Sequence, residues 1–176
     1  RFLAHSVDRE MTGPPMQRED QVKSWMLVYY APDMRKQPME FWKEEGKRTY
    51  EDHKGSMKIN DDIRRAATEA VGDASTPEQK LERIFNFCRA KIKNVTDDAS
   101  GLTSQQLEKL KENKSPADTL KRGYGDGPDI NYLFAALATA AGFDARYTRI
   151  GDRGRKFFDA NFTDTSFTPA YNLAVK

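Results

Sequence analysis

The chain has 176 residues, which suits one domain with flanking segments. Hydrophobic residues make up 38% of it and aromatic residues 11%, enough for one packed core and too much for a disordered chain. The 29 Lys and Arg residues nearly balance 27 Asp and Glu residues, so a net charge of +2 excludes the strongly basic surface typical of nucleic-acid-binding proteins. With one cysteine, Cys88, and two histidines, the sequence predicts no disulfide, no metal cluster and no cofactor.

Targeting and membrane signals are not visible in the sequence. No apolar run approaches the roughly 20 residues that a membrane-spanning helix needs, and no stretch has the pattern of a signal peptide. We therefore expect no membrane span. The first residue is Arg1 rather than Met, which is typical of a processed chain or a fragment of a longer one.

The first predicted strand covers residues 22–30, where β-branched and aromatic residues alternate with few polar ones before Pro32. Its nearly continuous apolar character from Trp25 onward predicts burial on both faces, against a partner that could lie outside this chain. We interpret residues 1–33 as an N-terminal strand and linker, with the end of an upstream β domain as one reading.

Three helices are predicted between residues 38 and 93. The first runs from Pro38 toward Lys54, the second starts at Asn60 and stops at Gly72, and the third starts with Thr76 as its N-cap. The third helix carries an apolar stripe at the spacing of a buried face, formed by Leu81, Ile84, Phe85, Cys88 and Ile92. Cys88 is therefore expected in the core, and His53, among charged residues, on a solvated helix face.

Two short capped helices follow, starting at Thr103 and Ser115. A strongly apolar helix is predicted over residues 128–141, with Gly142 ending it in a left-handed conformation. Residues 144–150 and 171–176 have the patterns of strands. This order predicts an α+β fold in which an N-terminal helical region precedes a central buried helix packed on a small antiparallel sheet.

A glycine-bracketed turn at residues 123–127 leads into this helix, which ends in Ala-Gly-Phe-Asp-Ala-Arg up to Arg146. This segment resembles the core motif of the transglutaminase-like superfamily, Gly-x-Gly-Asp-Cys-x-Asp followed by a helix ending in Ala-Gly-hydrophobic-x-Ala-Arg. Residues 42–47, 80–92 and 117–120 are also similar to bacterial members that carry a β-rich domain upstream. The resemblance implies a papain-like fold over residues 34–176, incomplete at its C-terminal end.

The chain departs from the family at the positions of the catalytic residues. Gly127 stands where the family has its nucleophilic cysteine, and Leu173, in the run from Tyr171 to Val175, stands where it has its histidine. The segment expected to carry the acid would follow Lys176. Without a thiol and an imidazole, the family's acyl transfer is not possible.

Two surfaces are candidates for binding. The first is the cleft at the start of the central helix, formed by Tyr124, Gly125, Asp126, Gly127 and Asp129, whose N–H groups could hold an anion unless Asp126 caps them. The second is a basic hairpin that could hold an acidic peptide or polysaccharide, or be a solvated turn, and contains Arg146, Arg149, Arg153 and Arg155.

Three functions fit these observations. The first is a non-catalytic, pseudoenzyme domain that binds a peptide or protein or links neighbouring domains of a longer polypeptide. The alternative is a cysteine-type transglutaminase, peptidase or amidase whose active site is altered or incomplete in this chain. The third is a helical interaction domain with a chance motif. The resemblance also implies an extracytoplasmic location.

Overall fold

The computed structural model describes residues 2–3, 29–30, 36–97, 100–151 and 158–176. The chain divides into two compact units. The smaller comprises Arg1–Lys47 and Arg149–Tyr171, and the larger comprises Arg48–Thr148 and Asn172–Lys176. Residues 22–28 of the predicted N-terminal strand lie outside the described part of the chain, and the predicted division at residue 33 stays a prediction.

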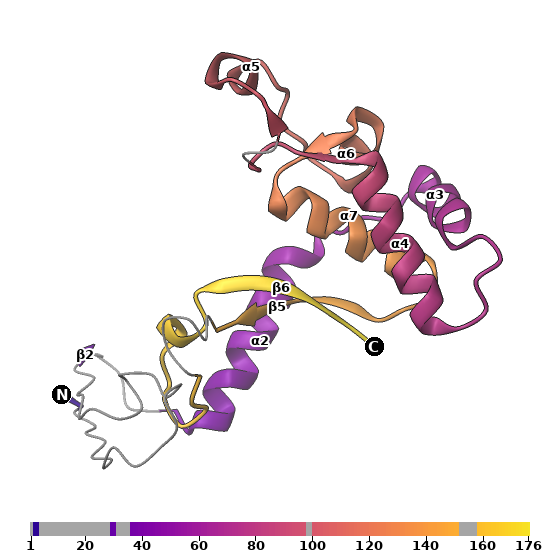
Figure 1. Ribbon diagram of the computed structural model, residues 1–176. Helices are drawn as coiled ribbons and strands as arrows, with labels where there is room; N and C mark the ends of the chain where they lie inside the picture. Colours follow the sequence, from indigo (N-terminus) through magenta and orange to yellow (C-terminus); the bar gives the residue numbers. More distant parts are fainter. Residues whose placement is uncertain (1, 4–28, 31–35, 98–99, 152–157) are drawn as a thin grey trace, which may run out of the picture. The chain divides into compact units, whose positions relative to one another are not determined.

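Helices build most of the larger unit (Figure 1). After the end of α2 (Pro38–Lys54) come α3 (Asp61–Val71), α4 (Pro77–Lys91), α5 (Ser104–Glu108), α6 (Pro116–Arg122) and α7 (Gly127–Ala140). In five of these helices the side chain of the N-cap accepts a hydrogen bond from a first-turn N–H; these caps are Asn60, Thr76, Thr103, Ser115 and Asp126.

Glycines end α6 and α7. Gly123 caps α6 with a φ of 70°. After α7, Gly142 has a φ of 97°. The N–H of Phe143 donates to the carbonyl of Ala138 at 3.0 Å, and the N–H of Gly142 donates to the carbonyl of Thr139 at 3.0 Å. This pair of bonds is a Schellman motif, so the predicted left-handed stop at Gly142 is confirmed.

α7 forms the centre of the core of the larger unit. Leu133, Ala136 and Leu137 on this helix are fully buried. They pack with residues of α3 and α4, namely Ile63, Ala66, Ala67, Ile84 and Cys88. One residue of the predicted stripe was misplaced: Phe85 is 52% exposed and lies beneath the guanidinium of Arg89, 5.7 Å from its ring centre. The stripe spans more of the helix surface than α3 and α7 cover, which leaves its flank in solvent.

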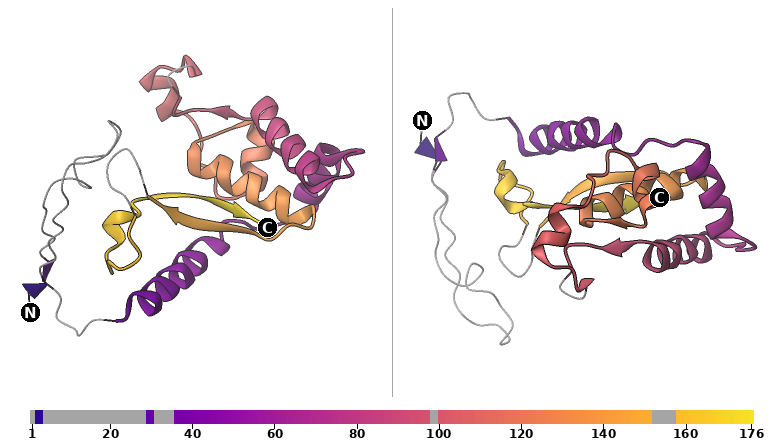
Figure 2. Two further views of the ribbon diagram at one scale, coloured as in Figure 1. Left: turned by 60° about the horizontal axis from the view of Figure 1, so that its bottom comes forward. Right: turned by 90° about the horizontal axis from the view of Figure 1, so that it is seen from above.

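A second face of α7 packs on an antiparallel pair of strands, β5 (Ala145–Ile150) and β6 (Ala170–Val175). Asp144 and Lys176 exchange backbone hydrogen bonds of 3.1 and 3.0 Å, the reciprocal pattern of antiparallel strands. Ala135 and Ala138 of α7 contact Ala145, Leu173 and Val175 of the strands. The two strands run side by side beneath the helix in Figure 2. The predicted α+β fold, with a central helix on a small antiparallel sheet, is confirmed.

Two short strand pairings were not predicted. β3 (Lys93–Asn94) pairs in parallel with β4 (Tyr124–Gly125), so the glycine turn before α7 includes a strand. β1 (Phe2–Leu3) pairs antiparallel with β2 (Tyr29–Tyr30). The described end of the predicted N-terminal strand therefore pairs with a segment of this chain.

Aromatic contacts dominate the described residues of the smaller unit. Trp42 of α2 donates its indole N–H to the carbonyl of Ala160 at 3.0 Å and meets the ring of Phe158 edge-on at 5.0 Å. Phe162 stacks on Phe167 of the 3-10 helix η2 (Thr165–Phe167), with ring centres 5.2 Å apart. Trp42 is therefore a packing residue of the smaller unit.

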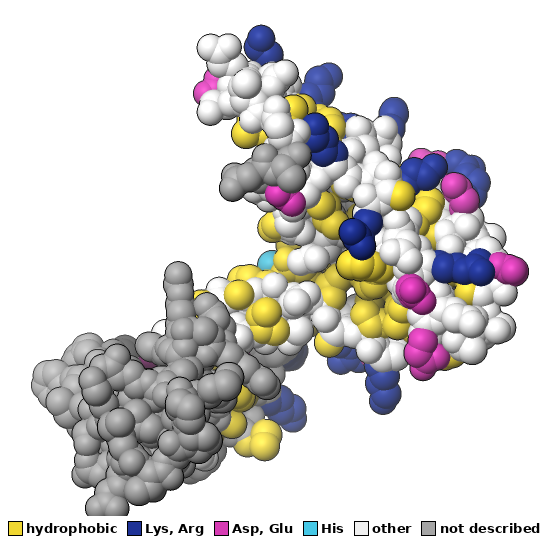
Figure 3. Space-filling model, viewed as in Figure 1, with side chains coloured by type: hydrophobic (Ala, Val, Ile, Leu, Met, Phe, Trp, Pro, Cys, Tyr) yellow, Lys and Arg dark blue, Asp and Glu magenta, His cyan; other side chains and the backbone are white. Residues whose placement is uncertain are grey.

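The visible surface of the larger unit mixes its charges (Figure 3). Lys and Arg side chains alternate with Asp and Glu side chains around a central group of hydrophobic ones on this face. This distribution agrees with the near balance of charge in the sequence.

Candidate functional site

The start of α7 is closed by its own carboxylates. Asp126 accepts a hydrogen bond from the N–H of Asp129 at 2.8 Å, and the side chain of Asp129 reaches back to the N–H of Asp126 at 3.4 Å. Pro128, in the first turn, has no N–H to offer. The helix start is thus capped and locally negative, which disfavours the predicted anion site and matches the alternative in which Asp126 is the cap.

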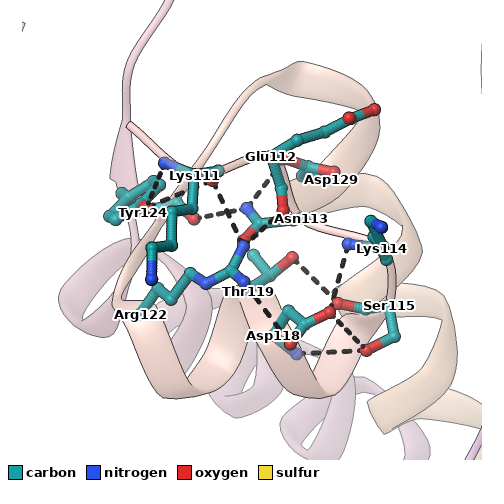
Figure 4. Close-up of polar contacts among 10 residues, drawn as sticks. All are labelled: Lys111, Glu112, Asn113, Lys114, Ser115, Asp118, Thr119, Arg122, Tyr124 and Asp129. Atoms are coloured by element: carbon teal, nitrogen blue, oxygen red, sulfur yellow. Dashed lines mark hydrogen bonds and ion pairs between the residues drawn. The ribbon is translucent and has the colours of Figure 1, made fainter. Parts of the chain in front are cut away.

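Asn113 ties the preceding loop to this helix start (Figure 4). Its amide nitrogen donates to the carbonyl of Tyr124 and to the carboxylate of Asp129, both at 2.9 Å. Its amide oxygen accepts from the guanidinium of Arg122 at 2.9 Å, and Arg122 also donates to the carbonyls of Lys111 and Glu112. One side chain therefore fixes the loop, α6 and α7 together. Asn113 and Arg122 could not be predicted as site residues from the sequence, because no local pattern marks side chains that join a loop to two helices.

The two glycines beside this cap stand in opposite steric environments. A Cβ on Gly125 would lie 2.7 Å from the Cβ of Asp129 and 3.1 Å from the methyl group of Thr119, so only glycine fits there. A Cβ on Gly127 would meet no atom within 4 Å. The position that corresponds to the family's nucleophile therefore has room for a side chain.

Two pockets flank α7. A loop-side pocket of about 630 Å³ is lined by four of the five predicted cleft residues, Tyr124, Gly125, Asp126 and Asp129, together with residues 95–97, 100, 102, 107 and 110–113. Gly127 is not part of its lining. Glu112, Asp126 and Asp129 give this pocket an acidic character.

A sheet-side pocket of about 650 Å³ lies between α4, α7 and β6. Ile130 and Asn131 line it, three and four residues after Gly127 and thus on the same face of the helix. Leu173, the residue at the family's histidine position, lines it from β6. The remaining lining comes from Phe85, Cys88, Arg89, Ile92, Asn94, Asp97, Phe134, Asn172 and Val175.

Cys88 is a core residue. The residue is 3% exposed and belongs to the core cluster between α3, α4 and α7. Burial raises the pKa of its thiol to about 12, because the apolar surroundings penalise the thiolate. The predicted core role of Cys88 agrees with this placement.

The sequence predicts His53 on a solvated helix face, and this prediction is wrong. His53 is half-buried at the end of α2, where its Nδ1 lies 2.6 Å from the hydroxyl of Tyr132 and its ring 4.3 Å from that of Tyr147. The pKa of Tyr132 is raised, mainly because burial disfavours the charged phenolate and secondly because Tyr147 lies close to it. The charged neighbours of His53 in the sequence hid this contact, since the side chains it meets lie 79 and 94 positions further along the chain.

The predicted basic surface is only partly described, and its two described arginines are engaged within the protein. Arg146 forms a two-pronged ion pair with Asp144, with its Nη2 at 2.8 Å, and this pairing lowers the pKa of Asp144. In the smaller unit, Arg149 donates to the carbonyl of Thr168 at 3.1 Å and to the hydroxyl of Tyr171 at 2.9 Å. Arg153 and Arg155 lie outside the described residues.

The described residues contain neither a metal-binding cluster nor a membrane-spanning helix. They hold no group of three or more His, Cys, Asp or Glu side chains placed to bind a metal ion. None of their helices is both long and apolar enough to span a bilayer.

Comparison with known proteins places this geometry in a family. The model of the transglutaminase-like superfamily matches residues 64–157, which include α4, α6, α7 and β5. The chain belongs to the transglutaminase-like superfamily. Comparison with curated proteins finds no match.

A solved structure supports the fold. A candidate protease from Parabacteroides distasonis ATCC 8503 superimposes on 99% of this chain with a TM-score of 0.50 and 11% sequence identity. The chain spans about a third of that protein, 33% of its length. At this identity the likeness concerns the fold alone.

Proposed function

We propose that this chain is a non-catalytic member of its superfamily, a domain that binds a peptide or protein, or links neighbouring domains of a longer polypeptide, without transferring acyl groups. The observation that carries the proposal is the glycine at the first position of α7. Acyl transfer of the family type needs a thiolate there and an imidazole to activate it. Gly127 offers no side chain, although a side chain would fit.

The rest of the described chain supplies no substitute. Its one thiol, Cys88, is buried in the core with a pKa near 12 and stays protonated at neutral pH. His53 is held by Tyr132 in an aromatic cluster that shares no residue with either pocket. Leu173, the residue aligned with the family's histidine, contributes an aliphatic side chain to the sheet-side pocket.

The test is the variant Gly127→Cys, assayed for amidase and transglutaminase turnover and for labelling by a thiol-reactive electrophile. We expect the new thiol to be labelled in the folded protein, since position 127 opens onto free space. We expect no turnover, because no imidazole is placed to deprotonate it. The wild-type protein is the control: its buried Cys88 should be labelled only on unfolding.

Turnover by the wild-type protein would contradict the proposal directly. Turnover by Gly127→Cys alone would show that another group activates the thiol and that the alignment of Leu173 is wrong. A double variant, Gly127→Cys with Leu173→His, tests that alignment further. It should gain activity only if residue 173 faces residue 127 across the sheet-side pocket.

The second candidate function is a cysteine-type peptidase, amidase or transglutaminase whose site is altered or completed elsewhere. Two observations favour it: the free space at position 127, and the description of the Parabacteroides distasonis protein as a candidate protease. Rapid, stoichiometric labelling of Cys88 in the folded wild-type protein would favour this enzyme over the binding domain.

A further inference from the structure

Side chains with unused hydrogen-bond donors line the helical side of the sheet-side pocket. Asn131, half-buried on α7, forms no hydrogen bond with the described residues. The carboxamide oxygen of Asn94 accepts from the N–H and the hydroxyl of Thr96 at 3.0 and 2.8 Å, which leaves its NH2 group without a partner in the described chain. Arg89 of α4 forms neither a hydrogen bond nor an ion pair with a described residue. The pocket therefore offers donors to a ligand that is rich in acceptor oxygens.

An aromatic wall stands beside these donors. Phe85 of α4 lines the pocket and is 52% exposed. Ile130 and Phe134 of α7 add apolar lining. The face of an aromatic ring carries partial negative charge and attracts the weakly positive hydrogens of C–H groups. A ligand that fits this lining combines polar oxygens with an apolar face of C–H groups.

The charges on the lining cancel. Arg89 and Asp97 are the charged residues among those that line the pocket, and they have opposite signs. The carboxylate of Asp97 can accept from hydroxyl groups, while the guanidinium of Arg89 can donate to their oxygens. A volume of about 650 Å³ is in the range of pockets that hold small molecules. A neutral ligand with many hydroxyl groups fits this mixture better than an anion or a cation.

From these observations we infer that the helical side of this pocket binds a neutral saccharide. One sugar ring lies with its C–H face on Phe85. Its hydroxyl oxygens accept hydrogen bonds from Arg89, Asn94 and Asn131, and another hydroxyl group donates to Asp97. These side chains belong to α4, to β3 with the residues that follow it, and to α7, so the site needs no group of β6. The inference goes beyond the proposed function, because a saccharide is a different class of ligand from a peptide or protein.

The experiment titrates the whole isotope-labelled chain with neutral oligosaccharides and follows its amide signals by NMR. The panel is cellotetraose, maltotetraose, mannotetraose and xylotetraose, at millimolar concentrations. We expect saturable shifts at residues 85–97 and 130–134 with at least one of them. Sorbitol is the matched ligand control, since it carries hydroxyl groups without a ring and should cause no saturable shift.

Variants at Phe85 separate ring stacking from general apolar contact. Phe85→Tyr keeps the aromatic face and should bind as tightly as wild type. Phe85→Leu keeps an apolar side chain but loses the ring, and should weaken binding about tenfold. Asn131→Ala should weaken it about fivefold through the lost hydrogen bond. Both positions are at least partly exposed, so the fold should survive.

Phe158→Leu is the matched protein control. It makes the same substitution at a similarly exposed phenylalanine, 46% exposed, in the smaller unit. Binding should be unchanged in this variant. A loss as large as that of Phe85→Leu would show that the saccharide does not bind at Phe85 in particular, and would overturn the assignment of the site.

The remaining contrary results each overturn a stated part of the inference. The absence of saturable shifts with every oligosaccharide of the panel overturns the saccharide site. Equal binding by wild type and Phe85→Leu, or saturable shifts with sorbitol, overturns the stacked sugar ring. All of these results leave the non-catalytic function standing, because that proposal depends on Gly127 and is tested by turnover.

Discussion

At the scale of single residues, Gly125 and Gly127 lie two positions apart but carry different constraints. A Cβ on Gly125 would clash with Asp129 and crowd Thr119. We therefore expect Gly125→Ala to lower the free energy of unfolding by about 1–3 kcal/mol, the usual cost of overpacking. Gly127→Ala is the matched control, because its Cβ meets free space at a helical position. It should be neutral or stabilising by about 0.4–1 kcal/mol.

Urea denaturation of the two variants measures both effects. Equal stabilities for Gly125→Ala and Gly127→Ala would show that the turn before α7 relaxes around a new methyl group. The steric account of Gly125 would then be wrong. The two variants would also no longer distinguish Gly127, where a side chain fits, from Gly125.

Cys88 gives a prediction that depends on pH. Its thiol has an ordinary pKa near 9.0 when unfolded and about 12 in the core. Below pH 9 both states keep the proton, so the thiol contributes no pH dependence. Between pH 9 and 12 only the unfolded chain loses it, and the free energy of unfolding should fall by about 1.4 kcal/mol per pH unit from this group.

Cys88→Ala is the control for this effect, since tyrosines and lysines also titrate above pH 9. Its stability will be lower at neutral pH because the smaller side chain leaves a cavity. The difference in unfolding free energy between wild type and Cys88→Ala, measured by chemical denaturation, should shrink as the pH rises from 9 to 11. A constant difference would mean that the thiol is not protected in the core.

Residue environments were predictable from the sequence only where the signal is local. The burial of Cys88 follows from its place on an apolar helical stripe. The contact of His53 with Tyr132 and the bridging role of Asn113 do not, because each depends on how distant segments meet. The exposure of Phe85 was missed for a related reason: helical periodicity shows which face is apolar, but not how much of it the neighbouring helices cover.

At the scale of elements, the cap of α7 controls the geometry of the site. Asp126→Ala removes the acceptor for the N–H of Asp129 and should lower the free energy of unfolding by about 1 kcal/mol. Asp126→Asn keeps a side-chain oxygen and should restore most of that loss. Thermal unfolding of both variants makes the comparison, and an equal loss in the two would mean that the carboxylate acts through its charge rather than as a cap.

Helices with caps were predictable and short strands were not. The starts of α3, α4, α6 and α7 follow from residues that accept hydrogen bonds from first-turn N–H groups, a signal contained within four positions. β3 and β4 contain two residues each and pair in parallel across 31 positions, so no periodicity marks them. The cleft residues of the α7 start were predicted for the same reason as the helix, whereas the sheet-side pocket depends on three elements that meet only in the fold.

At the scale of the whole molecule, the two units differ in how much apolar surface they bury. Among the described residues, the buried hydrophobic side chains belong to the larger unit, except for Phe167. The amides that open only on global unfolding lie where burial is densest. We therefore expect hydrogen–deuterium exchange, read by mass spectrometry, to be slowest at residues 133–138 of α7 and much faster at residues 39–47 of α2. Of these two segments, only the one in α7 should approach the global unfolding limit. Equal protection of the two segments would show that the smaller unit unfolds together with the core rather than before it, and the division into two units would then have no counterpart in stability.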